Sequence, residues 1–232
     1  MKKHLSTAAG VLLALAIALF ALTALVYAAG TNAHLLQRMF LRHAPASATG
    51  LPEAEYGPVA QMTAAYLAGS EEDFQHRFTT QDGTMYLCFN RREQQHMADC
   101  AVLFRLCRTV MVASLGALLV MIGAGILLPA LRRRMLRTCA CTLGGVIALA
   151  VALLLWGLID FSGLFVLFHR ISFTNDLWLL NPATDLLIRL MPTSFFITYA
   201  AAIGAVWLAC CLVCACIAAH LGRRLSPSNR GI

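Results

Sequence analysis

Apolar residues gather in four long stretches of this sequence instead of alternating with polar ones. The stretches cover roughly residues 10–29, 109–131, 138–158 and 195–219. A helix of about 20 residues is long enough to cross the ~30 Å hydrocarbon core of a bilayer. Every backbone polar group within that core must be hydrogen-bonded internally, so helices are the structure that fits. The pattern therefore predicts four transmembrane helices.

Composition agrees with this interpretation. The 232 residues are 59% apolar and only 12% charged, whereas a soluble domain carries about 25% charged residues. The net charge of +7 could suggest nucleic-acid binding, but the basic residues outside the short turns are scattered among acids and form no stripe. We therefore expect no nucleic-acid partner.

The basic residues predict the orientation in the membrane. One side of the predicted bilayer has nine basic residues and no acid, and the other has nine arginines and all eleven acids. The positive side is usually cytoplasmic, so both termini are expected there. Residues 26–28 could also pass as a signal-peptide cleavage site, although the apolar run before them is longer than most such signals. The nine basic residues are Lys2, Lys3, Arg132, Arg133, Arg134, Arg137, Arg223, Arg224 and Arg230.

The segment between the first two spans is expected to form a small domain outside the cytoplasm. Residues 45–58 are rich in Pro, Gly and Ala and predict a loop, and residues 59–68 predict a short helix with Glu71, Glu72 and Asp73 in its last turn. Alternating apolar residues between 79 and 90 around Gln81-Asp82-Gly83 favour a hairpin. The pattern becomes helical again from Arg91 and continues into the second span.

The third apolar stretch is too long for one straight span. A helix from Thr138 to His169 would measure ~47 Å, so a break is expected near Asp160, Ser162 and Gly163. Residues 164–168 and 185–192 then form two interfacial pieces. The predicted organisation is 1–29, cytoplasmic N-terminus and first span; 30–108, extracytoplasmic domain; 109–131, second span; 132–137, cytoplasmic turn; 138–158, third span; 159–194, extracytoplasmic or interfacial segment with the active site; 195–219, fourth span; 220–232, cytoplasmic tail.

The fold class that follows is an all-α membrane protein. We predict four transmembrane helices with a small extracytoplasmic domain, either α/β or mostly helical, between the first and second. The positions of its cysteines indicate a role in helix packing more than in metal or redox chemistry. Those in the third and fourth spans are best explained as helix contacts, with a metal or redox cluster as the alternative. Cys88 and Cys100 face outward and could form a disulfide.

Two of the seven histidines stand out as candidates for acid–base chemistry. His96 and His169 each fall on the outer side near a predicted membrane boundary, with acids and amides nearby. Glu93, His96 and Asp99 are spaced i, i+3 and i+6, so they line one flank of a helix. The alternative is that these residues cap helices and anchor the interface, and Trp178 by itself is best explained as a membrane anchor. The group around His169 comprises Arg170, Asn175, Trp178 and Asp185.

Several other chemistries can be tested directly on the sequence. It has no Gly-x-Ser-x-Gly, His-Glu-x-x-His or phosphate-binding-loop motif. The His-x4-Asp pattern of phospholipid acyltransferases fails because Ala101 and Thr174 occupy the required positions. Glu93, Asp99 and the two histidines are of the types that bind metals, but their spacing does not constrain them to one site. We expect neither a metal nor a cofactor.

The stretch 167–178, with Asn181, Pro182, Asp185 and Pro192, resembles the signature of the lipoprotein intramolecular transacylase family. Residues 92–99, with a His-Met pair followed by Asp, are similar to the other motif of that family. The four-span layout with a large first outward loop also agrees. Thr193, where an acid is expected, and Cys100, where a valine is expected, depart from the pattern.

The resemblance implies a bacterial, multi-pass protein of the cell membrane with its active site at the outer leaflet. It implies acyl transfer from the glycerol sn-2 ester of a diacylglyceryl-modified lipoprotein to the α-amine of its N-terminal cysteine, which gives the lyso-form. Donor and acceptor are one molecule, so no cofactor is needed. The expected partners are such lipoproteins and membrane lipids. The resemblance carries over His96 and His169 as catalytic.

The chemistry of this reaction suits histidine. The α-amine, with a pKa near 7.7–8.0, is already partly neutral at pH 7, whereas the glycerol alkoxide needs a proton as it leaves. We hypothesise that one histidine accepts the amine proton and the other protonates the glycerol oxygen. Asn175, Arg170 or backbone N–H groups could stabilise the oxyanion. Glu93, Asp99 and Asp185 could orient the histidines or simply solubilise the surface.

Two other functions remain open at this stage. A four-span protein with a large outward loop could be a non-catalytic scaffold, which would require that loop to be braced by a Cys88–Cys100 disulfide. An acyltransferase that uses a phospholipid as donor is the second alternative, and it would release a separate lysophospholipid.

Overall fold

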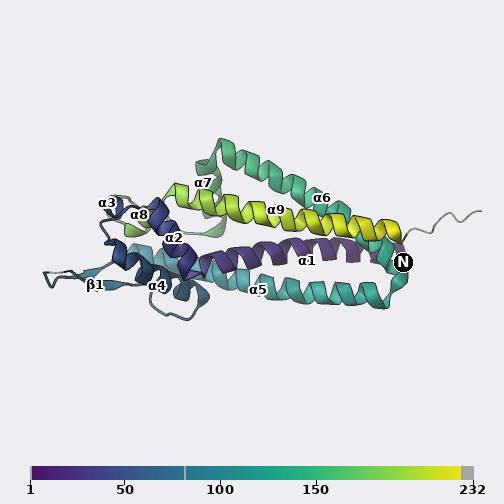
Figure 1. The fold of residues 1–232 in the computed structure, drawn as a ribbon, viewed down its shortest axis with the longest axis horizontal. Coiled ribbons are helices and arrows are strands. Elements are labelled where there is room, and N and C mark those ends of the chain that lie inside the picture. The colour runs from purple at the N-terminus through teal and green to yellow at the C-terminus, as the bar shows by residue number, and fades with distance from the viewer. Residues whose placement is uncertain (1, 81, 226–232) are drawn as a thin grey trace, which may run out of the picture. The chain divides into compact units, whose positions relative to one another are not determined.

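The computed structural model describes residues 2–80 and 82–225. Within these residues, four helices are long and apolar enough to cross a membrane (Figure 1). Their number agrees with the four predicted spans, and the protein is an integral membrane protein built mostly of helices. The four are α1 (Lys2–Gly30), α5 (Arg91–Leu127), α6 (Pro129–Ile159) and α9 (Thr193–Arg224).

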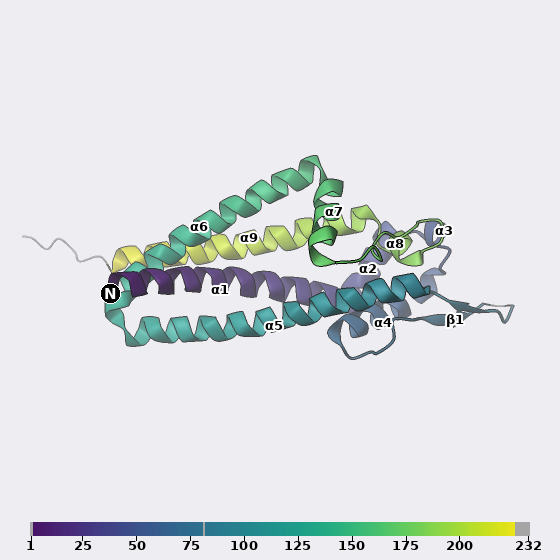
Figure 2. The ribbon, with the colours of Figure 1, turned by 180° about the vertical axis from the view of Figure 1, so that it is seen from behind.

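One compact unit, here called the membrane unit, contains most of the apolar helical residues. It comprises the described parts of Met1–Leu25, Thr109–Leu158 and Ile203–Ile232. In this unit α1 lies beside both α5 and α9, as the two opposite views agree (Figures 1 and 2). Few residues of α5, α6 and α9 are buried by protein, and this suits helices whose outer faces meet lipid. The core is formed by Leu13, Ala14, Ala18, Met135, Cys139, Leu143, Cys211 and Ala218.

Small residues allow the helices of the membrane unit to approach closely. A Cβ added at Gly10 of α1 would lie 2.5 Å from the carbonyl oxygen of Met135 and 2.6 Å from Cβ of Thr138, both on α6. Trp207 of α9 donates its indole N–H to the carbonyl of Ala18 over 2.8 Å. Close backbone approach and interhelical hydrogen bonds are the main sources of helix association in lipid, where the hydrophobic effect contributes little.

Gly10→Ala is therefore expected to destabilise the protein by about 1–3 kcal/mol, because the new methyl group would meet backbone that cannot yield without separating α1 from α6. The matched control is Gly144→Ala. Gly144 also lies inside a helix, but nothing lies within 4 Å of an added Cβ, so this change should be neutral or stabilising by about 0.5–1 kcal/mol. Apparent unfolding midpoints in detergent compare the two. Equal midpoints would show that Gly10 is not a contact point.

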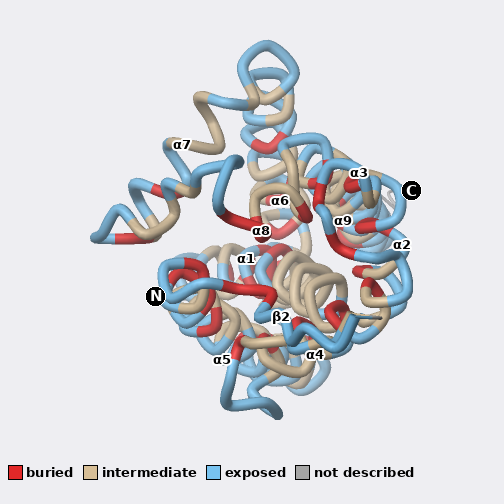
Figure 3. The backbone as a smooth tube through the Cα atoms, turned by 90° about the vertical axis from the view of Figure 1, so that its left-hand side faces the viewer, coloured by how far each residue is buried: buried red, intermediate tan, exposed pale blue. Residues whose placement is uncertain are grey.

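The other compact unit, here called the head unit, comprises Val26–Arg108 and Ile159–Ala202. Its core joins residues far apart in the chain, among them Phe40, Tyr56, Phe89, Leu190 and Phe195. The leucines of α8 are buried, and α8 lies among the red stretches of tube in Figure 3. Besides the ends of the four long helices, the head unit contains α2 (Ala33–His43), α3 (Ala46–Thr49), the 3-10 helix η1 (Glu53–Glu55), α4 (Tyr56–Ala68), β1 (Arg77–Thr79), β2 (Met85–Leu87), α7 (Phe161–Ser172) and α8 (Leu186–Leu190).

The predicted hairpin is confirmed. β1 and β2 are antiparallel with Phe78 opposite Tyr86, and Gly83 has a φ of 85°, which a turn residue without Cβ adopts readily. Gln81 of this turn lies outside the described residues. The side chain of Gln75 extends the pairing, because it accepts from the N–H of Phe89 and donates to its carbonyl oxygen.

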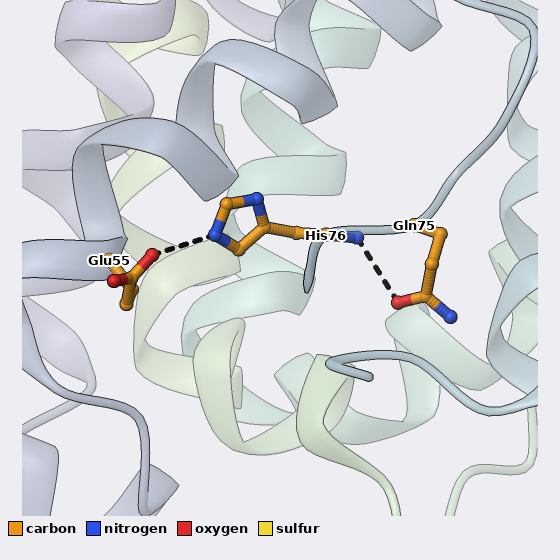
Figure 4. Close-up of polar contacts among 3 residues, drawn as sticks. All are labelled: Glu55, Gln75 and His76. Carbon is orange, nitrogen blue, oxygen red and sulfur yellow. Dashed lines mark hydrogen bonds and ion pairs between the residues drawn. The ribbon is translucent and has the colours of Figure 1, made fainter. Parts of the chain in front are cut away.

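A histidine fixes the base of the hairpin. Nε2 of His76 lies 2.7 Å from Oε2 of Glu55, which belongs to η1, and the N–H of His76 donates to the side chain of Gln75 (Figure 4). His43, on α2, lies 3.1 Å from the hydroxyl of Ser194. His34 and His43 both lie on α2, and His43 and His76 each contact a polar side chain.

Prolines explain where local structure differs from the sequence predictions. Residues 132–137, predicted as a turn, are helical, and the break between spans lies at Leu128 because Pro129 begins α6 at a position where its missing N–H costs nothing. Residues 45–58 were predicted as loop, but Pro45 and Pro52 precede the short helices α3 and η1.

The end of α4 differs from its prediction, whereas the end of α6 agrees with it. α4 ends before Glu71, at Gly69, whose φ of 80° stops the helix, so the three acids are not in its last turn. The predicted break after the third span is confirmed: the helix ends at Ile159, and Asp160 accepts from the N–H of Gly163 to cap α7. Cys88 and Cys100 are both free thiols.

Candidate active site

Two buried histidines lie side by side in the head unit. His96 comes from the first turns of α5 and His169 from the last turn of α7. Each is 7% exposed, and their ring centroids are 6.1 Å apart. Residues 91–108 of α5 carry six charged residues, and its apolar stretch begins only at Thr109. His96 therefore precedes the apolar part of α5, and His169 lies on α7, which is not one of the four helices long enough to span a membrane.

The hydrogen bond of His169 determines which of its nitrogens is free. Nδ1 lies 2.7 Å from the carbonyl oxygen of Phe165, one turn earlier in α7. A carbonyl can only accept, so Nδ1 must carry the proton. Nε2 of neutral His169 then keeps its lone pair, as a general base requires.

His96 presents the opposite arrangement. Nε2 lies 3.7 Å from the sulfur of Cys100, one turn later in α5. Burial raises the pKa of Cys100 to about 12, so the thiol stays protonated and can donate to Nε2. In the tautomer of His96 that accepts this hydrogen, Nδ1 carries the ring proton. This atom is buried and has no hydrogen-bond partner within the described residues, so a substrate oxygen would satisfy it.

Aromatic rings enclose the two histidines. The rings of Phe165 and Trp178 have centroids 4.2 Å and 4.9 Å from that of His169. Phe173 touches both histidines, at 5.2 Å from His96 and 5.6 Å from His169, and Phe168 meets His169 edge-on. Trp178 thus packs against His169 within the head unit.

The apolar surroundings keep both histidines neutral. Burial, with a smaller effect of neighbouring His169, lowers the pKa of His96 to about 4. Burial also lowers the pKa of His169, against the opposing effect of its hydrogen bond to the carbonyl of Phe165. Removing a cation from water is costly where nothing compensates it. At neutral pH neither histidine therefore begins as an imidazolium.

Glu93, three residues before His96, joins the start of α5 to the start of α8. It is 1% exposed. Its Oε2 accepts from the N–H of Asn90, just before α5, and its Oε1 from the N–H of Leu187 in the first turn of α8. Asn90 in turn accepts from the N–H groups of Arg92 and Glu93, which completes a reciprocal cap. Burial raises the pKa of Glu93, and these two N–H groups oppose the shift.

Asp185 continues this network. Its carboxylate accepts from the side chain of Asn90 at 2.8 Å, the N–H of Asn181 at 2.7 Å and the hydroxyl of Thr184 at 2.8 Å. Burial alone would raise the pKa of Asp185, but these donors outweigh it and the pKa is lowered. Glu93 and Asp185 therefore hold backbone in place, and within the described residues neither carboxylate is hydrogen-bonded to a histidine.

The segment after α7 is attached to α5 by polar contacts. Nδ2 of Asn175 donates to Asp99 over 2.8 Å, and the guanidinium of Arg92 donates to the carbonyl of Asp176. These contacts position the stretch that carries Trp178. Arg170 is exposed at the end of α7 and makes no hydrogen bond within the described residues.

The predicted site residues thus differ in their placement. The structure brings together His96, His169 and Trp178, and it places Glu93, Asp99, Asn175 and Asp185 in the supporting network. Sequence reasoning did not assign roles to Phe165 or Asn90, although the spacing Phe165-Phe168-His169 on one helix flank is visible in the sequence. Within residues 2–80 and 82–225, no three His, Cys, Asp or Glu are grouped to hold a metal ion.

Comparison with known proteins adds to this geometry. The family described as lipoprotein intramolecular transacylase Lit matches residues 11–196, more than half of the chain. No curated protein compared with the chain matches it. The membrane integral lipoprotein intramolecular transacylase Lit from Bacillus cereus has a similar solved structure, with 23% identity, a TM-score of 0.71 and 98% of each chain covered.

A second structure of that protein, from a variant in which a histidine is replaced by arginine, gives 22% identity and a TM-score of 0.65. It covers 98% of this chain and 94% of that one. At these identities the likeness to solved structures establishes the fold alone.

Proposed function

Because the chain belongs to the lipoprotein intramolecular transacylase family, we propose that it moves the sn-2 acyl chain of a diacylglyceryl-modified cysteine to the α-amine of that cysteine. The product is a lyso-form lipoprotein with an N-acyl cap. The observation that carries the proposal is the pair of buried neighbouring histidines, in which His169 keeps Nε2 free to accept and His96 keeps a buried Nδ1 without a partner among the described residues.

His169 serves as the proton carrier. The neutral amine attacks the ester carbonyl, and Nε2 of His169 removes a proton from the nitrogen. The imidazolium so formed returns this proton to the glycerol oxygen as the C–O bond breaks, and His169 is neutral again. Neither histidine holds an extra proton beforehand, so the proton that the glycerol oxygen receives is the one that left the amine. This revises the hypothesis of one acid and one base.

His96 stabilises the oxyanion. Its Nδ1 is buried without a hydrogen-bond partner among the described residues, and a donor in a water-poor site is most effective where charge develops during reaction. Asn175 is held by Asp99 and therefore supports the site from outside. The attack closes a strained ring of roughly eight atoms, and the surrounding aromatic rings restrict the substrate to a bent conformation.

The proposed setting is the outer leaflet of a bacterial cell membrane. The nine basic residues that share one side without an acid support cytoplasmic termini. The head unit would then lie outside the cytoplasm, where lipoproteins carry their lipid anchor. The proposed partners are diacylglyceryl-modified lipoproteins and membrane lipids, and the reaction needs no cofactor.

The experiment that tests the function is co-expression with a reporter diacyl lipoprotein in a host without an N-acylating enzyme. Tandem mass spectrometry of the N-terminal peptide distinguishes the outcomes. Intramolecular transfer leaves the total mass unchanged and moves one acyl group to the fragments that contain the amine. A lysophospholipid and a heavier peptide would indicate a phospholipid donor instead. A glycerol group that keeps both chains would reject the proposal for this reporter.

The scaffold alternative has lost its main support. It requires a disulfide-braced outward loop, whereas Cys88 and Cys100 are free thiols and Cys100 contacts His96. Replacing both cysteines with serine should leave acyl transfer in place, since a serine hydroxyl at position 100 can also donate to Nε2 of His96. A scaffold that depends on the disulfide would lose partner binding.

The pH profile should show only one titrating group near neutrality. Between about pH 6 and 7 the logarithm of the rate should rise with a slope of about 1, because the substrate amine, with a pKa near 7.7–8.0, loses its proton there. Burial lowers the pKa of His96 to about 4 and lowers that of His169 below its ordinary value, so neither should add the slope of an ordinary histidine in this interval. Single-turnover rates provide the measurement. A slope that approaches 2 near pH 6 would mean that an essential histidine titrates normally.

A further inference from the structure

The membrane unit has a strongly basic end with no acid of its own. All eleven Asp and Glu residues of the sequence lie in Val26–Arg108 and Ile159–Ala202, and none lies in the segments of the membrane unit. Eight basic residues of the membrane unit lie on its helices near their ends: Lys2 and Lys3 on α1, Arg132, Arg133, Arg134 and Arg137 on α6, and Arg223 and Arg224 on α9. Arg230 lies outside the described residues.

Helix packing brings these basic residues to one place. A Cβ built at Gly222 of α9 would lie 3.1 Å from Cγ and 3.5 Å from the backbone N of Arg137 on α6. The C-terminal end of α9, with Arg223 and Arg224 next to Gly222, therefore lies directly against the first turns of α6. Arg137, Arg223 and Arg224 are all exposed. The junction thus carries three like charges, which repel one another.

A second contact adds the start of α1. Nε of Arg134 donates to the hydroxyl of Thr7 over 3.1 Å, and Thr7 lies one turn after Lys3. Gly10 of α1 approaches the backbone of α6 at Met135. Orientation in the membrane requires only that positive charge lie on one side. It does not require that the charges of three helices converge, so this convergence calls for a further explanation.

Two more features at this end favour an anion. Nε of Arg132, in the first turn of α6, is buried and has no hydrogen-bond partner within the described residues. The N-terminus of a long helix also carries partial positive charge, and α6 begins here. A phosphate group could accept from such donors and reduce the repulsion, since guanidinium groups bind phosphate oxygens in pairs.

We propose that the junction of α6 and α9, formed by Arg137, Arg223 and Arg224, binds the phosphodiester headgroup of an anionic phospholipid. The exposed apolar faces of the same helices, with Val213 and Ile217 on α9, would lie along its acyl chains. A lipid satisfies both surfaces, whereas a free phosphate satisfies only the basic one. Basic pockets between transmembrane helices are known to bind anionic headgroups. The proposal does not depend on the acyl-transfer reaction.

The test uses the purified full chain in detergent micelles and its intrinsic tryptophan fluorescence on heating. Phosphatidylglycerol added to the micelles should raise the unfolding midpoint in a saturable way, by roughly 5–10 °C at about 100 times the dissociation constant. Phosphatidylcholine and inorganic phosphate should not. Equal shifts with the two lipids would overturn the proposal, and so would an equal shift with inorganic phosphate, which would indicate a free-anion site.

Paired variants locate the site. Arg137→Gln with Arg224→Gln should raise the phosphatidylglycerol concentration for half-maximal shift at least about tenfold, given the loss of two guanidinium contacts. The matched control, Arg38→Gln with Arg77→Gln, removes the same charge from exposed positions of the head unit and should leave the titration unchanged. Equal effects of the two pairs would show a general charge effect and contradict the site.

A charge-conserving pair keeps the test valid if the glutamine variants do not fold. Arg137→Lys with Arg224→Lys retains the positive charge that orients the helices but loses the planar donors that pair with phosphate oxygens. It should bind the lipid more weakly than the wild type. Affinity equal to that of the wild type would mean that charge alone attracts the lipid and that this junction is not a built site.

Discussion

Replacing His169 with alanine is expected to lower the single-turnover rate of acyl transfer by about 10²–10⁴-fold, the usual contribution of a proton-transfer group. Nε2 of this residue is its only nitrogen free to accept, because Nδ1 is held by the carbonyl of Phe165. His169→Gln should be equally poor, since an amide nitrogen cannot take a proton. The rate is measured on the reporter peptide by tandem mass spectrometry.

His96 should respond differently to the same two kinds of replacement. In His96→Asn, the amide nitrogen can occupy the place of Nδ1 and still donate, whereas in His96→Gln it takes the place of Nε2. The asparagine variant should therefore retain about ten times the activity of the glutamine variant, while His96→Ala should lose about 10²–10³-fold. The opposite order, with glutamine the more active, would show that Nε2 faces the substrate.

A histidine outside the site provides the control. His34 lies on α2 and is exposed, so His34→Ala should leave the rate unchanged. Comparable losses at His34 and His169 would mean that the substitutions act through folding. If His169→Ala kept more than half of the wild-type rate while the protein remained folded, the proton-carrier role would be wrong.

The sequence predicts this site better than it predicts the way the site is held together. The two histidines, the membrane spans and the break at Asp160 follow from residue type, apolar length and spacing. The contacts that join Glu93 and Asp185 to distant parts of the chain do not, because Glu93 and Leu187 are 94 positions apart and Asn90 and Asp185 are 95. Glu93 and Asp185 gain these backbone and side-chain partners only because the start of α5 packs against the start of α8.

The sequence also does not predict which ring nitrogen of each histidine carries the proton. They depend on single atoms, the carbonyl oxygen of Phe165 and the sulfur of Cys100, whose positions follow from helix geometry at i−4 and i+4. Had α7 been predicted as a helix ending at Ser172, the contact between His169 and Phe165 could have been anticipated. The apolar stretch around it indicated only an interfacial segment of unspecified structure.

Glu93→Ala is expected to destabilise the head unit strongly. It would leave the N–H groups of Asn90 and Leu187 without their acceptors in a place that water does not reach, at a cost of roughly 2–5 kcal/mol. For a chain of this length the unfolding midpoint should fall by roughly 5–15 °C. Glu72→Ala, which removes an exposed carboxylate, is the control and should change the midpoint little.

Glu93→Gln distinguishes a positioning residue from a catalytic one. The amide keeps one acceptor oxygen but turns its NH₂ group toward the other N–H, so the midpoint should fall less than with alanine but remain below the wild type. The rate per folded molecule, measured at low temperature, should stay within about threefold of the wild type, because Glu93 supports α5 and α8 and moves no proton. A variant with a normal midpoint and a rate reduced about 100-fold would place the carboxylate in the chemistry. His169 would then not be the only group that moves the proton.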